Sequence, residues 1–257
     1  QGWIAQDLQA GAGHQSTARA HFGLIPVRCW PCVPMGRIVW ITGRPCSGKT
    51  FLGDYLATEL DGWTHVEGDG AAGPELLPCY HDYWFRNQDA PDEVWRPPYA
   101  RLCEQVKARA EGGPVVVTQA VYRRGIRDFI RVQLPGVVFL LVDAPREELA
   151  TRNLERMKRI LAGMGVSVEE YWKTDPARLE ERYGEYSEAF FLEWQRTVIY
   201  NGMEGFAADE GECYTVNGSR RDETAIDQAH AVLGLPPRTK PVPTARIAEI
   251  NDARYRA

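Results

Sequence analysis

The feature that most constrains the fold is a glycine-framed loop between an apolar run, residues 38–41, and a segment with helical apolar spacing. Glycines at both ends allow the backbone to wrap around a phosphate with its N–H groups pointing inward. A helix that begins near Lys49 adds the partial positive charge of its N-terminus. The pattern G-x-x-x-x-G-K-[ST] is matched by Gly43, Arg44, Pro45, Cys46, Ser47, Gly48, Lys49 and Thr50. The loop therefore predicts a nucleoside triphosphate site, in which Lys49 contacts the β- and γ-phosphates and Thr50 offers its hydroxyl to Mg²⁺.

The rest of the chain alternates short apolar runs with helical periodicities. Strands are expected at 38–41, 63–67, 114–118, 137–142 and 213–216. Helices are expected at 49–60, 95–110, 123–132, 146–161 and 223–233. Continuous apolar strands that alternate with helices indicate a parallel sheet covered on both faces. The expected fold class is therefore α/β: a P-loop NTPase with a five-stranded parallel sheet flanked by helices.

The chain divides into a core and additions to it. We expect an N-terminal extension at 1–36, a P-loop domain at 37–235 and an extended, proline-containing C-terminal tail at 236–257. Within the core, 163–206 forms an enlarged helical lid insertion. Aromatic and apolar residues recur there every three or four positions, which predicts one long helix: Tyr183, Tyr186, Phe190, Trp194 and Val198. We interpret this stripe as helix packing rather than as a ligand site.

Charge and cysteine usage narrow the function classes. A net charge of −5 and a pI near 5.6 argue against a general nucleic-acid binder. No apolar run approaches the ~20 residues of a membrane-spanning helix. Cys46 lies inside the phosphate loop, where reduced thiols are the simpler interpretation, so we expect an intracellular reducing compartment, either the cytoplasm or an organelle interior.

The extension at 1–36 allows two interpretations. It contains C-x-x-C at 29–32, which has neither a second pair for zinc nor a helix start for redox chemistry. Its acid-poor, arginine-containing composition fits the remainder of an import segment, and fits a partner-binding extension equally well.

Two carboxylates follow the second expected strand, at Glu67 and Asp69. Strand ends beside a phosphate loop meet at one edge of a parallel sheet. Glu67 could then hold a Mg²⁺-bound water, and Asp69 could accept a proton from an attacking hydroxyl. Alternatively, both are residues of a glycine-rich turn. Asp143, at the end of the fourth strand, is interpreted as the cap of the next helix rather than as a metal ligand.

Arginines follow the third and fourth strands. Arg123, Arg124 and Arg127 could bind a carboxylate or phosphate, or form a solvated basic helix face. Arg152, Arg156 and Arg159 recur on one helical face, which could close over the triphosphate or form salt bridges with neighbouring glutamates. After the fifth strand, residues 217–219 either border the nucleotide base or form a simple turn.

With these motifs in place, the chain from 37 to about 235 resembles the gluconate kinase and shikimate kinase group of P-loop kinases. VEGDG at 66–70 is similar to the D-G-D or D-S-D strand end of that group. DEVWRPPYARL at 92–102 is similar to its R-x-P-W-L stretch, and VVVTQAVYRRGIRDFIR at 115–131 to its Y-R-D segment. VVFLLVDAPREELATRNLER at 137–156 is similar to its fourth strand and the start of its lid.

The resemblance implies an ATP-dependent kinase with a lid and a substrate-binding region. By this similarity Glu67 lies near Mg²⁺, and the catalytic candidates are Lys49, Asp69, Arg127, Arg152 and Arg156. The chain departs from the group at Tyr122, where the group has lysine, and at Trp95, where it has arginine. The lid is also longer, and an expected histidine after Gly70 is missing.

The expected function is transfer of the γ-phosphoryl group of ATP, with Mg²⁺, to a hydroxyl of a small, polar, anionic metabolite. Two other interpretations stay open. The chain could be a nucleotide-binding or degenerate kinase-fold subunit of a larger assembly, held through the tails and 163–206, or it could form a homo-oligomer through the same parts. It could also be a nucleoside or nucleotide kinase.

Overall fold

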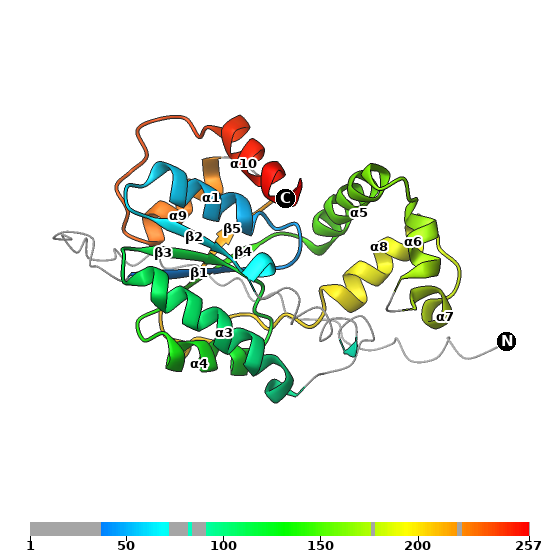
Figure 1. Ribbon diagram of the computed structural model, residues 1–257, viewed down its shortest axis with the longest axis horizontal. Helices are drawn as coiled ribbons and strands as arrows, with labels where there is room; N and C mark the ends of the chain where they lie inside the picture. The colour runs from blue at the N-terminus through cyan, green and yellow to red at the C-terminus, as the bar shows by residue number, and fades with distance from the viewer. Residues whose placement is uncertain (1–36, 72–81, 84–90, 176–177, 220–222, 257) are drawn as a thin grey trace, which may run out of the picture.

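A five-stranded, all-parallel sheet forms the centre of the chain (Figure 1). The computed structural model describes residues 37–71, 82–83, 91–175, 178–219 and 223–256, so the extension at 1–36 lies outside the described residues. The strand order is β2-β3-β1-β4-β5. The strands are β1 (Ile38–Thr42), β2 (Thr64–Glu67), β3 (Val115–Thr118), β4 (Val138–Asp143) and β5 (Cys213–Asn217). This confirms the expected α/β class with its parallel sheet.

The register brings the carboxyl ends of the strands to one edge. Ile41 on β1 is aligned with Thr118 on β3 and with Leu140 on β4. Thr118 is in turn aligned with Glu67 on β2. The loops that leave β1, β2 and β4 therefore emerge side by side, which is where open parallel sheets bind their ligands.

Helices cover both faces of the sheet, as Figure 1 shows. One face packs on α3 (Asp92–Ala110) and α4 (Arg124–Gln133), and the other on α1 (Lys49–Glu59), α9 (Glu223–Val232) and α10 (Thr244–Arg256). Alternate residues of β1 contribute to the two cores, because successive strand side chains point to opposite faces. Trp40 belongs to the first core and Ile41 to the second, and neither is exposed to solvent.

A helical insertion with a third core follows β4. It consists of α5 (Arg146–Gly163), α6 (Val168–Thr174), α7 (Leu179–Tyr183), α8 (Glu188–Trp194) and the π-helical turn η2 (Gln195–Ile199). Its centre is Trp172, which is fully buried. The Trp172 ring meets the ring of Trp194 edge-on, with 5.3 Å between centroids. The rings of Tyr183, Tyr186 and Phe190 also contact it, so the interpretation of the aromatic stripe as packing is confirmed.

The single long helix expected through this stripe is wrong. The chain breaks between α7 and α8 at Gly184, which has a φ of 87° that favours glycine. The indole of Trp172 donates a hydrogen bond of 2.9 Å to the carbonyl of Gly184, which fixes the break against the core.

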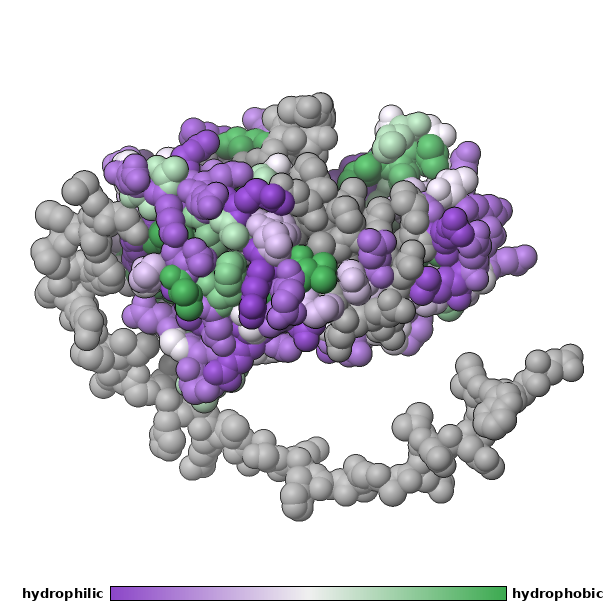
Figure 2. Space-filling view, turned by 60° about the horizontal axis from the view of Figure 1, so that its bottom comes forward, coloured by the Kyte–Doolittle hydropathy of each residue, from purple (hydrophilic) through white to green (hydrophobic). Residues whose placement is uncertain are grey.

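On the outside, hydrophilic side chains cover most of the face seen in Figure 2, and apolar ones form small, separate patches.

The expectation of an extended C-terminal tail is also wrong. Its prolines precede α10 rather than continuing through it, and Pro243 stands immediately before the helix, where a missing N–H is tolerated. Ile247 on α10 is fully buried in the same core as α1 and α9. Among the described residues, no helix combines the length and the apolar composition that a membrane crossing requires.

Candidate functional site

The phosphate loop has the backbone geometry of an anion cradle. Gly43 has a φ of 149°, and a Cβ there would lie 2.4 Å from the carbonyl oxygen of Val142. Gly48 has a φ of 103° and is the N-cap of α1, with no side chain capping the helix. The first N–H groups of α1 have no acceptors within the helix, because such acceptors would lie before its start. The loop therefore combines glycines in conformations open only to glycine with the N-terminus of a helix, as phosphate binding requires.

Four charged side chains converge on the mouth of this loop. The Nζ of Lys49 donates a hydrogen bond of 2.9 Å to the carbonyl of Arg44 within the loop. Burial lowers the pKa of Lys49; the nearby carboxylates of Asp69 and Glu67 act against this change, whereas Arg156 adds to it. The structure thus brings together Lys49, the neighbouring Glu67 and Asp69, and Arg156 from three separate parts of the sequence.

A hydrogen bond and close packing hold the turn after β2 in place. Glu67 Oε2 accepts a hydrogen bond of 2.7 Å from the N–H of Gly70, so Glu67 stabilises the turn. Gly68 packs against Gln119, the residue after β3, and a Cβ on Gly68 would lie 2.5 Å from the Gln119 amide oxygen. Asp69 is exposed on this turn. The turn interpretation and the functional one are therefore compatible, because Asp69 on this turn also acts electrostatically on Lys49.

The interpretation of Asp143 as a helix cap is wrong. The N-cap of α5 is Pro145, and no side chain caps that helix. Asp143 instead forms an ion pair of 2.7 Å with Arg44, a variable position of the phosphate loop. Arg44 also donates a hydrogen bond of 3.1 Å to the carbonyl of Tyr200. Sequence reasoning missed this role because the loop pattern leaves position 44 unspecified.

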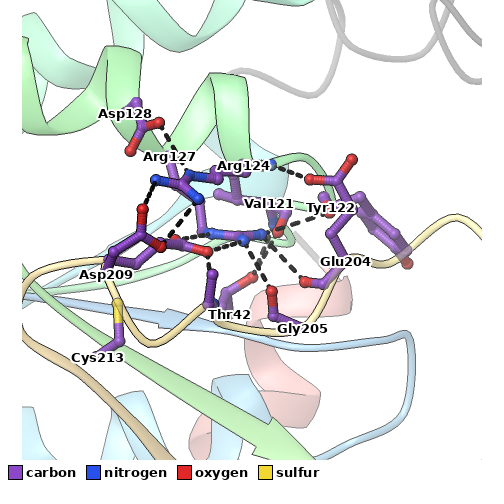
Figure 3. Close-up of polar contacts among 12 residues, drawn as sticks. Thr42, Val121, Tyr122, Arg124, Arg127, Asp128, Glu204, Gly205, Asp209 and Cys213 are labelled. Carbon is purple, nitrogen blue, oxygen red and sulfur yellow. Dashed lines mark hydrogen bonds and ion pairs between the residues drawn. The ribbon is translucent and has the colours of Figure 1, made fainter.

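The assignment of Arg127 as a catalytic group needs correction. Its side chain is 1% exposed and forms a two-pronged ion pair with Glu210, at 2.8 and 2.6 Å. The remaining N–H groups donate to the carbonyls of Tyr122, Glu204 and Gly205 (Figure 3). These bonds account for all five donors of a guanidinium. Arg127 therefore holds the segment after the insertion against α4 and has no donor left for a substrate.

Arg124 on α4 makes further contacts to the same segment after the insertion. It forms an exposed ion pair of 2.8 Å with Asp209, and its backbone N–H donates a hydrogen bond of 2.5 Å to Glu204. Neither expected interpretation, an anion site or a solvated basic face, describes Arg124 and Arg127, because both form ion pairs within the protein.

The lid arginines separate into two roles. Arg152 forms an ion pair with Glu148 and donates to the carbonyls of Gly218 and Ser219, so it ties α5 to the turn after β5. The salt-bridge alternative holds for this residue. A Cβ on Gly218 would lie 2.6 Å from the Ser47 carbonyl, which places that turn directly beside the phosphate loop. Arg156 lies one turn further along α5 and is half-buried. Its positive charge contributes to lowering the pKa of Lys49.

Tyr122 is a second residue that the motifs did not select. It is 9% exposed, and burial, followed by the neighbouring Tyr200, raises its pKa well above the usual value. Arg44 and Asp69 are among the charges that act on it. Its phenol therefore stays protonated beside the candidate site. The signal for it was its position, where the resembled group has lysine.

The residue types at the loop mouth suit Mg²⁺. This ion prefers oxygen ligands and takes only one or two carboxylates from the protein, with water and substrate phosphates completing its shell. Thr50 supplies a hydroxyl at the start of α1, and Glu67 supplies a carboxylate at the end of β2. Within the described ranges there is no group of three or more His, Cys, Asp or Glu side chains arranged to hold a metal.

Comparisons with known proteins agree with this architecture at the level of the fold. No protein-family model and no curated protein matches the sequence. Among solved structures, a sugar kinase from Janibacter sp. HTCC2649 aligns with a TM-score of 0.51 and 24% identity, over 78% of this chain and 96% of the other. The chain shares its fold with that structure. A gluconokinase from Sinorhizobium meliloti 1021 aligns over 86% of this chain and 98% of its own, with a TM-score of 0.48 and 21% identity.

Proposed function

We propose that the chain is a kinase that transfers the γ-phosphoryl group of ATP to a hydroxyl of a small polar metabolite, with Mg²⁺. The observation that carries this proposal is that Asp69 and Glu67, from the turn after β2, and Arg156, from α5, act electrostatically on Lys49 of the phosphate loop. A P-loop that only binds nucleotide does not require a carboxylate facing its lysine. A transfer reaction does, because the acceptor hydroxyl must lose its proton.

Each group has a distinct role in the proposed reaction. The N–H groups of 43–50 and the ammonium of Lys49 bind the phosphates and stabilise charge on the group being transferred. Arg156 approaches the same phosphates from α5. Asp69 orients the acceptor hydroxyl and accepts its proton. Arg152 holds the turn after β5 beside the loop, so its role in this proposal is to position the nucleotide site.

Thr50 and Glu67 are the residues that would hold Mg²⁺. When bound, the ion neutralises charge on the β- and γ-phosphate oxygens. An anionic acceptor, as a gluconate kinase would use, is the narrower form of the proposal. With all donors of Arg127 occupied by protein groups, that residue does not support the narrower form.

The decisive experiment is ATP turnover against a panel of sugar acids, polyols, sugars and nucleosides. We expect turnover with one class, and we expect Asp69→Asn to reduce kcat by about 10²- to 10⁴-fold, the contribution of a positioned base. Nucleotide affinity should stay unchanged in that variant. Nucleotide binding without turnover on any acceptor would favour the alternative, a kinase-fold subunit of a larger assembly.

The loop assignment has its own test. We expect Lys49→Ala to weaken MgATP binding by about 100-fold, since a charge-assisted contact with phosphate is removed. Lys158→Ala is the matched control, because Lys158 lies on α5 and pairs with Glu155 and Glu188 rather than with the loop. Calorimetry measures both affinities. Equal binding by the two variants would show that the loop does not hold the triphosphate.

A further inference from the structure

Two separate contacts tie the phosphate loop to the last turn of the helical insertion. Arg44 Nε donates a hydrogen bond of 3.1 Å to the Tyr200 carbonyl. Two positions along the loop, the thiol of Cys46 lies 3.4 Å from the Asn153 amide oxygen. Asn153 on α5 then donates a hydrogen bond of 2.8 Å to the amide oxygen of Gln195. Gln195 is the first residue of η2 and Tyr200 is its C-cap, so the loop is linked to both ends of that turn, to Tyr200 directly and to Gln195 through Asn153.

Gln195 and Tyr200, at the two ends of these contacts, are among the most buried polar residues of the insertion. Gln195 is 2% exposed, Tyr200 is fully buried, and the Tyr200 hydroxyl donates to the Leu149 carbonyl at 3.1 Å. A π-helical turn is rare and usually marks a functional position in a helix. Here the turn directs the amide of Gln195 towards Asn153 while its far end accepts from Arg44. The contacts thus join α5, η2 and the loop into one hydrogen-bonded unit.

Cys46 explains why the loop needs this support. Its φ of 64° is in the left-handed region, which costs a non-glycine residue about 1–2 kcal/mol. In this conformation the neighbouring N–H groups point into a concave nest suited to an anion. The Cys46 side chain is 8% exposed, and its thiol can donate to the Asn153 oxygen. Asn153 therefore stabilises a backbone conformation that phosphate binding requires.

We propose that Asn153 and Gln195 are positioning residues for the phosphate loop, and that they couple docking of the helical insertion to nucleotide binding. The ligand in this proposal rests on the proposed function, but the coupling itself does not. Because coupling between two sites is reciprocal, bound nucleotide stabilises η2, and a correctly docked η2 preorganises the loop. The insertion would then control nucleotide affinity through residues that do not touch the nucleotide.

The first measurement compares two variants with a matched control. We expect Asn153→Ala and Gln195→Ala each to weaken MgADP binding by about 5- to 30-fold, the effect of a lost buried hydrogen bond. Glu188→Gln is the control, since its 2.7 Å ion pair with Lys158 also joins α5 to α8 but makes no contact with the loop. Calorimetry should show the control within twofold of the unchanged chain. Equal affinity in all three variants would overturn the proposal.

The second measurement needs no nucleotide. Hydrogen exchange of the peptide spanning 43–50 should be faster in Gln195→Ala than in Glu188→Gln, although residue 195 lies outside the loop. Equal exchange in the two variants would refute the coupling. If the unchanged chain binds no nucleotide at all, the proposed function fails, and the exchange comparison still decides whether the insertion positions the loop.

Two substitutions in the loop itself test the same contact without changing the insertion, so their result does not depend on the folding of the insertion variants. Cys46→Ser keeps a donor for Asn153, whereas Cys46→Ala removes it, and both retain the same backbone requirement. We expect the serine variant to bind MgADP as the unchanged chain does, and the alanine variant to bind about 5- to 30-fold more weakly. Equal affinities for the two would show that the contact with Asn153 does not position the loop.

Discussion

Among single side chains, the Arg127–Glu210 pair has the clearest consequence for stability. Burial alone would raise the pKa of Glu210, but hydrogen bonds from Arg127 and from the Ala207 N–H, with the charges of Arg127 and Arg131, bring it to about 2. The pair is enclosed, with both side chains 1% exposed or less. It attaches the segment after the insertion to α4.

This lowered pKa predicts a specific loss of stability in acid. A carboxyl whose folded pKa is below its unfolded value stabilises the fold above the unfolded value, here 4.5, and loses that contribution as pH falls towards 2. We expect a loss on the order of 3 kcal/mol over this window. Denaturant unfolding at several pH values measures it, and Glu210→Gln should remove this part of the pH dependence.

At neutral pH, Glu210→Gln should cost about 3–5 kcal/mol, because it leaves the buried Arg127 without its counter-charge. The neighbouring exposed pair gives the matched control, since Asp209 is 69% exposed where it meets Arg124. Asp209→Asn should change the free energy of unfolding by less than about 1 kcal/mol. Equal effects of the two substitutions would contradict the role assigned to the buried pair.

The phosphate loop could be predicted from sequence because its chemistry is contained in consecutive residues. Glu67 and Asp69 could be placed beside it because parallel strands end at one edge. The role of Arg127 could not, since its partner Glu210 lies 83 positions away and no local pattern links them. The alignment of Arg44 with Asp143 likewise depends on β1 and β4 being neighbours in space.

Among the helices, α10 shows how an addition to the core can become part of it. Ile247 is fully buried against the core that contains α1, the helix that begins at the phosphate loop. The strands were predictable because continuous apolar runs leave few alternatives. This helix was not, because its prolines lie before it and its apolar content is low enough to resemble a tail.

We expect Ile247→Ala to lower the free energy of unfolding by about 2–4 kcal/mol, through lost burial and the cavity left behind. Arg246→Ala is the control on the preceding position, since Arg246 is 65% exposed and pairs with Glu59 only at 3.7 Å. That variant should change stability by less than about 1 kcal/mol. Urea unfolding of both variants distinguishes a packed helix from a loosely attached one, for which the two effects would be equal.

Among the described residues, the three largest hydrophobic clusters lie on the two faces of the sheet and inside the insertion. The third core is centred on Trp172 and is built from α5, α6, α7, α8 and η2. A core built from its own elements can loosen without unfolding the sheet, because local openings follow cooperative units.

Trp172→Ala should therefore act mainly on the insertion. We expect amides of α6 and α8 to exchange with solvent faster in this variant, while those of β1, β3 and β4 keep their protection. Replacing a buried tryptophan by alanine typically lowers the free energy of unfolding by about 3–5 kcal/mol. Hydrogen exchange followed by peptide mass analysis measures the pattern. A uniform loss of protection across sheet and insertion would show instead that the three cores unfold together.

The strand order also fixes the distance between the ends of β1 and β2, which lie on either side of β3. β3 lies between β1 and β2, so Ile41, before the phosphate loop, and Glu67, before Asp69, are two strand spacings apart, about 10 Å. Backbone hydrogen bonds maintain that interval whatever the side chains are. In the proposed reaction, an acceptor would therefore have to span the same interval in every variant. Any change in preferred acceptor size should therefore map to the segments that leave the strands, and not to the strands themselves.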